Sequence, residues 1–138
     1  MHDSAIDALA LLRQQVFSPR AVALIGASGD AAKNTSRPQR YMRKYGYTGK
    51  LFPINPGRDE ILGEKSYPDV TAVAEAIDHA FIMVPANRVN KALEQCVAKK
   101  IPVVTIYTDG FAEVGAEGRA MHCSSALFTR FAGTMMKA

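Results

Sequence analysis

A short apolar run that ends abruptly in small residues constrains the fold more than any other feature of this sequence. Residues 21–25 read Ala-Val-Ala-Leu-Ile, and Gly26, Ala27, Ser28 and Gly29 follow directly. A strand that is apolar on both faces is typical of a parallel sheet covered by helices on both sides. A glycine-containing turn after such a strand exposes backbone N–H groups to a phosphate. The segment therefore predicts a covered parallel sheet with an anion site where its first strand ends.

Further apolar runs alternate with segments of helical periodicity. We expect strands at residues 21–25, 51–54, 80–84 and 101–107, with irregular chain at residues 61–63. We expect one helix opened by Ser4 in a capping box, one from near Pro38 to a left-handed cap at Gly46, one at residues 70–77, and one capped by Asn87. Repeated strand–helix units favour parallel pairing with right-handed crossovers. The predicted fold class is therefore α/β, a Rossmann-like doubly wound parallel sheet in a single domain, after a helical leader at residues 1–19.

The chain of 138 residues is basic, with a net charge of +4 at pH 7. Many of its cations lie around one loop and do not form a long stripe along the chain. The cations at this loop are Lys33, Arg37, Arg40, Arg43 and Lys44. Because aromatic residues make up only 8% of the chain and tryptophan is absent, it lacks the stacking platform of a nucleic-acid binder. The pattern favours a small polyanionic ligand and no nucleic-acid partner. From position alone, Arg40, Arg43 and Lys44 favour a solvated helix face.

Other sequence features exclude several classes of protein. No run approaches the roughly 18 consecutive apolar residues of a membrane span, so no membrane partner is expected. Residues 1–4 are acidic and polar where a signal peptide is basic, so the protein is expected to be cytoplasmic. The two cysteines, Cys96 and Cys123, form no C-x-x-C pair, and Cys96 lies on the apolar stripe of an expected helix as a reduced core residue. No catalytic residue and no metal site is predicted.

Ligands of doubly wound sheets bind beyond the carboxyl ends of the strands, where the strand order reverses. The turns expected at that edge are residues 26–37, 55–58, 84–87 and 108–111. Lys33, Arg37 and Arg58 lie in these turns and can neutralise phosphates. The sequence therefore predicts a nucleotide-type ligand with several phosphates. From position alone, Asp109 favours a turn or cap role.

A dinucleotide is the first such ligand to weigh. The G-x-G-x-x-G/A fingerprint is partly met, because Gly26 and Ala31 fit its ends while Ser28 replaces the middle glycine. The second strand ends in Asn55, where NAD sites carry the Asp or Glu that holds the ribose diol. This disfavours NAD, while Arg58 keeps NADP open because an arginine there can meet a 2′-phosphate.

Four motifs in order carry a family resemblance. They are residues 22–28 (VALIGAS), 52–56 (FPINP), 83–86 (MVPA) and 109–115 (DGFAEVG). Over about residues 17–120 the chain resembles the N-terminal CoA-binding domain of NDP-forming acyl-CoA synthetases. It is similar, more distantly, to the alpha subunit of succinyl-CoA synthetase.

The resemblance implies a CoA site. The turn after the first strand would face the nucleotide and its phosphates, and Arg58 matches a family lysine that meets a CoA phosphate. Val84 and Pro85 would border the ligand, Thr108 and Asp109 would approach the pantetheine arm, and Arg37 matches the basic loop of small CoA-binding proteins. The implied binding residues are Gly26, Ser28, Gly29, Asp30, Ala31, Arg37, Asn55, Pro56, Arg58, Val84, Pro85, Thr108 and Asp109.

The chain also departs from the family. Residues 121–128 (MHCSSALF) stand where a fifth strand and a Gly-Pro-Asn-Cys-like turn are expected. We therefore expect a CoA-binding domain at residues 20–120 and a truncated or altered C-terminal segment at residues 121–138. We expect neither the phosphorylated histidine nor the ATP-grasp module of the synthetases within these 138 residues. The expected function is binding of CoA or acyl-CoA without completing ligation alone, with an ATP-grasp or ligase partner. An NADP-dependent enzyme, a regulatory or partner subunit, and a homo-oligomer stay open.

Overall fold

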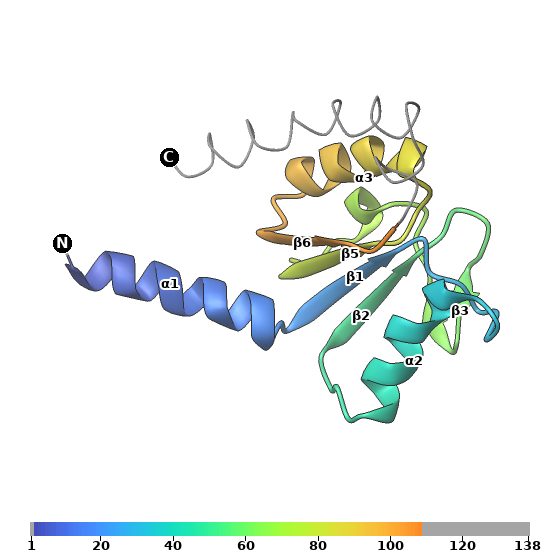
Figure 1. Cartoon of the computed structure of the whole chain (residues 1–138), viewed down its shortest axis with the longest axis horizontal. Helices are drawn as coiled ribbons and strands as arrows, with labels where there is room; N and C mark the ends of the chain where they lie inside the picture. The colour runs from blue at the N-terminus through green and yellow to red at the C-terminus, as the bar shows by residue number, and fades with distance from the viewer. Residues whose placement is uncertain (1, 109–138) are drawn as a thin grey trace.

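A computed structural model describes residues 2–108 of the chain (Figure 1). The elements, in chain order, are α1 (His2–Phe17), β1 (Ala21–Ile25), the 3₁₀ turn η1 (Asn34–Ser36), α2 (Arg37–Lys44), β2 (Lys50–Ile54), β3 (Glu60–Ile61), β4 (Glu64–Lys65), the 3₁₀ turn η2 (Val70–Ala72), β5 (His79–Ile82), α3 (Ala86–Ala98) and β6 (Val103–Ile106). Residues 109–111 of the turn predicted at residues 108–111, the motif at residues 109–115 and the segment at residues 121–138 lie outside the described residues.

The central sheet has four strands in the order β2-β1-β5-β6, and every neighbouring pair is parallel. The chain runs from β1 outward to β2 and then crosses to the other side of β1 to form β5. The strand order therefore reverses between β1 and β5, as in a doubly wound sheet. The predicted Rossmann-like α/β class is confirmed. A short antiparallel hairpin, β3–β4, stands beside this sheet.

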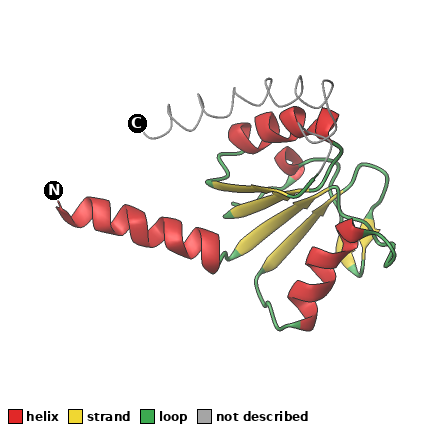
Figure 2. Cartoon of the chain, viewed as in Figure 1, coloured by secondary structure: helices red, strands yellow, loops and turns green. Residues whose placement is uncertain are grey.

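Helices cover both faces of the sheet, which explains the unbroken apolar runs of the strands (Figure 2). Along β1, Ala21, Ala23 and Ile25 belong to one buried cluster, while Val22 and Leu24 belong to the other. The first cluster is completed by residues of α3, and the second by Met42 of α2 and Ile61 of β3. Alternate side chains of β1 therefore pack into two separate hydrophobic clusters.

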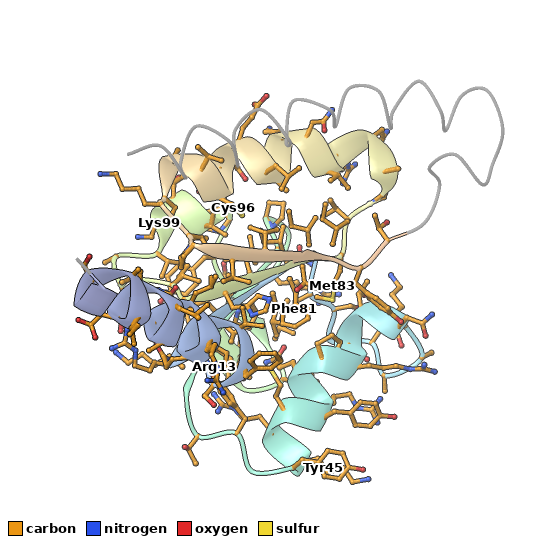
Figure 3. The ribbon with its side chains drawn as sticks, turned by 60° about the vertical axis from the view of Figure 1, so that its left-hand side comes forward. Arg13, Tyr45, Phe81, Met83, Cys96 and Lys99 are labelled. Carbon is orange, nitrogen blue, oxygen red and sulfur yellow. The ribbon has the colours of Figure 1, made fainter. Side chains whose placement is uncertain are left out.

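Cys96 lies on the inner side of α3, between the helix and the sheet (Figure 3). It is a free cysteine that is 1% exposed, and burial raises the pKa of its thiol to about 12. The thiol is therefore protonated at neutral pH and behaves as a small apolar group. The predicted position of Cys96 in the core is confirmed.

The limits of α2 follow its predicted signals. Pro38 stands in its first turn, where the missing N–H is not needed. Gly46 takes φ +86° after the helix, and its N–H donates to the carbonyl of Arg43 at 3.3 Å. The N–H of Tyr47 donates to the carbonyl of Met42 at 2.8 Å. These two bonds form a Schellman motif that satisfies the last carbonyls of the helix.

Two predicted helices differ from the structure. The first helix runs from His2, so Ser4 lies inside α1 and does not cap it. The third predicted helix, residues 70–77, is reduced to the single turn η2, after which Val73 takes extended angles of φ −78° and ψ 119°. Val73 and Ile77 are both buried in the same core cluster as residues of the sheet. Their apolar side chains therefore pack in the core from a segment that is not helical.

The remaining differences concern element ends. Pro85 occupies the N-cap position of α3, and Asn87, the predicted cap, lies in its first turn. Strands β5 (His79–Ile82) and β6 (Val103–Ile106) are shorter than the apolar runs that predicted them. The hairpin β3–β4 occupies a region that was expected to be irregular.

Helix α1 extends away from the sheet (Figure 1). Its apolar residues recur at helical spacing, yet Ile6, Leu9 and Leu12 are 62%, 60% and 46% exposed. The end of the helix is tied to the sheet through Asp78, which accepts hydrogen bonds from Gln14 at 3.4 Å and from the backbone N–H of Arg20 at 2.8 Å. Among the described residues, no helix is both long and apolar enough to cross a membrane.

Candidate functional site

A pocket of about 450 Å³ opens at the carboxyl ends of β1 and β2, beside the β3–β4 hairpin. The residues that line it are Ser28, Gly29, Asp30, Lys33, Asn55, Arg58, Glu60, Ile61 and Leu62. They come from the turn after β1, the turn after β2 and the hairpin that follows. The pocket therefore combines two of the four turns predicted at this edge with an element that was not predicted.

The turn after β1 is held by its own side chains. The hydroxyl of Ser28 accepts a hydrogen bond from the N–H of Asp30 at 3.1 Å. The side-chain carboxylate of Asp30 accepts a hydrogen bond from the N–H of Ala32 at 2.9 Å, and the backbone carbonyl of Asp30 accepts one from the N–H of Lys33 at 3.0 Å. The loop thus has a defined shape without a ligand. Among the described residues, the Ser28 hydroxyl donates no hydrogen bond, so its proton is available to an acceptor in the pocket.

Three backbone N–H groups of this turn remain available to a ligand. Within residues 2–108, the N–H groups of Ser28, Gly29 and Ala31 donate no hydrogen bond. Successive free N–H groups in a turn form a concavity that binds anions, as in phosphate sites. Gly26 does not share this role, because its N–H donates to the carbonyl of Ile54 at 3.0 Å. The prediction of exposed N–H groups at the turn therefore holds for Gly29 and fails for Gly26.

Asn55 links the two turns of the pocket. Its side-chain Nδ2 donates to the carbonyl of Ala27 at 3.0 Å, and its Oδ1 accepts from the N–H of Gly57 at 2.9 Å. A carboxylate at this position could accept the second bond but could not donate the first. The asparagine that replaces the ribose-binding acid of NAD sites thus has a structural reason in this fold.

Two cations face the pocket. Lys33 and Arg58 are exposed, and neither forms an ion pair within the part of the chain that the structure describes. Arg43, by contrast, is paired with Glu64. Carboxylates are also present, but Asp30 is engaged in its own turn while Glu60 is exposed at the rim. Unpaired cations beside free N–H groups create a site suited to phosphate.

Several predicted binding residues do not line this pocket. Arg37 is the first residue of α2 and is exposed; Ala31 and Pro56 lie in the turns themselves. Val84 and Pro85 follow β5, and Thr108 follows β6, at neighbouring points of the same edge of the sheet. Asp109 lies outside the described residues. No group of three His, Cys, Asp or Glu residues that could hold a metal occurs among residues 2–108.

The hairpin is the part of the site that sequence reasoning missed. Its two-residue turn is Leu62-Gly63, and both residues have positive φ, +50° and +79°. The glycine in the second position was a usable signal, because hairpin turns with two positive φ values favour glycine there. The leucine in the first position concealed it, since asparagine, aspartate or glycine is the usual residue.

Buried polar contacts hold the hairpin in place. Gln39 of α2 is 1% exposed, and its Nε2 donates to the carbonyl of Ile61 at 2.9 Å and to the carboxylate of Glu64 at 2.8 Å. Arg43 donates to the same carboxylate and to the carbonyls of Tyr47 and Gly49. Helix α2 therefore fixes the wall of the pocket that the hairpin forms.

Comparison with known proteins identifies the family to which this chain is similar. The model of the family described as "CoA binding domain" matches residues 20–123. The alpha subunit of ADP-forming acetate–CoA ligase I from Pyrococcus furiosus is 39% identical over 110 residues, which cover 77% of this chain and 24% of that protein. The ADP-forming acetate–CoA ligase of Methanocaldococcus jannaschii is 42% identical over 97 residues, which cover 70% of this chain and 14% of that protein.

A solved structure agrees with these relatives. The dinucleotide-forming acetyl-coenzyme A synthetase 1 of Ca. Korarchaeum cryptofilum, in complex with phosphate and ADP, has a TM-score of 0.73 and 37% identity to this chain. The match covers 79% of this chain and 23% of that one. The chain spans only 14–24% of the length of these three proteins. The resemblance drawn from the four motifs is confirmed, and the chain belongs to the CoA binding domain family.

Proposed function

We propose that this chain binds CoA or acyl-CoA at the pocket between the turns after β1 and β2. The phosphates of the ligand accept hydrogen bonds from the N–H groups of Ser28, Gly29 and Ala31 and are neutralised by Lys33 and Arg58. The observation that carries the proposal is that Ser28 and Gly29, whose N–H groups donate no hydrogen bond within residues 2–108, line one pocket together with Lys33 and Arg58, which form no ion pair among the same residues. Coenzyme A has a pyrophosphate and a 3′-phosphate, so it offers enough negative charge for all of these donors.

The location of the pocket suits one half of such a ligand. In doubly wound sheets, the residue at the end of the second strand lies beside the adenosine ribose. Asn55 and Arg58 occupy that place here. The rest of the ligand would then extend along the carboxyl edge toward the ends of β5 and β6, where Val84, Pro85 and Thr108 lie. These residues remain proposed contacts of the pantetheine arm, as does Asp109.

We assign to this chain only the binding of CoA or acyl-CoA, and no chemical step. The acetate–CoA ligases that it resembles are much longer, and it spans 14–24% of two of them. We propose that thioester formation requires the regions of these ligases that lie outside the stretch similar to this chain. Those regions would be supplied by the same or another polypeptide. An ATP-grasp module is the partner that such chemistry calls for.

Isothermal titration calorimetry of the 138-residue chain with CoA tests the proposal. We expect Arg58→Ala and Lys33→Ala each to weaken CoA binding about tenfold or more. A hydrogen bond to a charged group contributes about 1.5–3 kcal/mol, and 1.4 kcal/mol corresponds to tenfold in affinity. Arg13→Ala is the matched control, because this arginine lies on α1 and outside the pocket (Figure 3).

The same titration separates CoA from a dinucleotide. NADPH added as a competitor should leave the apparent CoA affinity unchanged. Displacement of CoA by equimolar NADPH would favour the alternative hypothesis that Arg58 binds the 2′-phosphate of NADP. Equal affinities for CoA in the wild-type, Arg58→Ala and Lys33→Ala chains would show that the pocket is not the CoA site.

A further inference from the structure

Leu62 adopts a backbone conformation that leucine rarely takes. It is the first of the two turn residues between β3 and β4, and its φ is +50°. A side chain with a Cβ is strained in this left-handed region. Among the described residues, Lys100 is the other non-glycine residue with positive φ, and there the N–H of Ile101 closes the end of α3 by donating to the carbonyl of Cys96. At Leu62 the positive φ belongs to the two-residue hairpin turn, whose first position is usually asparagine, aspartate or glycine.

The side chain of Leu62 is also placed unfavourably for the free protein. It is 44% exposed and lines the pocket, whereas the preceding Ile61 is 2% exposed and belongs to the core under α2. The hairpin therefore anchors itself with one apolar residue and presents the next one to the pocket. Strained residues that persist in a fold cluster at ligand sites, where the conformation serves binding.

The hairpin holds Leu62 in a fixed position. The buried Gln39 donates to the carbonyl of Ile61, immediately before Leu62, and to Glu64, immediately after the turn. Arg43 pairs with the same Glu64. Since both ends of the turn are bound to α2, the leucine is preorganised before a ligand arrives, which lowers the entropic cost of a contact.

The chemistry of the lining indicates which part of the ligand Leu62 meets. Lys33, Arg58 and the free N–H groups suit phosphates, whereas Leu62 offers an exposed apolar surface at the β2 side of the pocket. That side is where a doubly wound sheet holds adenosine. Resting on the proposed function, we propose that Leu62 contacts the face of the purine base of CoA and is a specificity-determining residue for the adenosine half.

The substitution Leu62→Asn tests this role, because asparagine suits the turn but removes the apolar surface. We expect the melting temperature of the free protein to stay the same or rise. We expect CoA affinity to fall about tenfold, while affinity for 4′-phosphopantetheine, which has no base, stays at the wild-type value. Leu11→Asn is the control, since Leu11 is a similarly exposed leucine (50%) on α1. A merely structural role would lower the melting temperature and weaken both ligands.

Nuclear Overhauser effects give a direct readout in the wild-type chain. With methyl-labelled leucine and bound CoA, we expect cross-peaks from the Leu62 methyl groups to H2 or H8 of adenine. Cross-peaks to the geminal methyl groups of the pantetheine arm instead would overturn the assignment, as would an unchanged CoA affinity of Leu62→Asn. A wild-type chain that binds no CoA would refute the proposed function together with this inference; in the other outcomes the proposed function stands.

Discussion

At the scale of single residues, glycine at position 26 serves the sheet. Its φ is +88°, and a Cβ added there would lie 2.7 Å from the carbonyl oxygen of Met83 and 3.0 Å from Cγ1 of Val84. Gly26 therefore lets the end of β1 approach the end of β5 at the point where the strand order reverses. It shapes the site without being a donor to the ligand, because its N–H is bonded to Ile54.

We expect Gly26→Ala to reduce the free energy of unfolding by about 2–5 kcal/mol. The left-handed φ costs roughly 1–2 kcal/mol for a residue with a Cβ, and overpacking costs about 1–3 kcal/mol. Urea denaturation measures the loss. Gly29→Ala is the control, because no atom lies within 4 Å of its added Cβ and its φ is not positive. Equal losses in the two variants would contradict this account of Gly26.

Sequence reasoning identified site residues by type but could not assign all of their contacts. Ser28, Gly29, Asp30, Asn55 and Arg58 were predicted and do line one pocket. The bond between the Asn55 side chain and the carbonyl of Ala27 joins positions 28 apart in the sequence, so no local pattern announces it. Arg37 was predicted from its neighbours in sequence, but the start of α2 places it outside the pocket lining.

At the scale of elements, strong local signals predicted structure and weak ones did not. The apolar run of β1 and the Pro38 and Gly46 signals of α2 mark these elements well, because burial and backbone geometry allow few alternatives. Strands β3 and β4 have two residues each, too short for any periodicity. Residues 70–77 have apolar spacing compatible with a helix, but contacts with the sheet draw Val73 into extended chain instead.

The junction of α1 with β1 depends on the ionised carboxylate of Asp78. Burial alone raises the pKa of Asp78, but hydrogen bonds from the side chain and backbone of Arg20 and from Gln14 outweigh it and hold this pKa below its usual value. A carboxyl whose pKa is lowered by folding stabilises the folded state above its unfolded pKa of about 3.9. That stabilisation is lost as the pH falls through the lower folded value.

Asp78→Asn should therefore unfold at a lower urea concentration than the wild-type chain at pH 7. The difference between the two midpoints should shrink as the pH is lowered below about 4, because the wild-type carboxyl then becomes neutral as well. Urea titrations at a series of pH values measure it. A difference that stays constant down to the lowest pH at which both chains fold would mean that the charge of Asp78 contributes nothing to the junction.

At the scale of the whole molecule, the parallel sheet gathers the groups that we propose to bind the ligand at one edge. Both turns of the pocket follow strands β1 and β2, whose carboxyl ends must lie side by side in a parallel pair. The chain has a net charge of +4, and two of its cations, Lys33 and Arg58, lie at this edge and form no ion pair with any other described residue. The fold class could thus be predicted from alternating patterns, whereas the shape of the pocket needed the hairpin that α2 holds in place.

The central claim is that a phosphate-bearing ligand is held by the backbone of the turn after β1. The most direct test is a titration of the ¹⁵N-labelled chain with CoA, followed by amide chemical shifts. We predict that the amides of Ser28, Gly29 and Ala31 show the largest downfield shifts, since these N–H groups have no acceptor within the described chain. Saturable shifts confined to other surfaces, such as α1, with these three amides unmoved, would contradict the account.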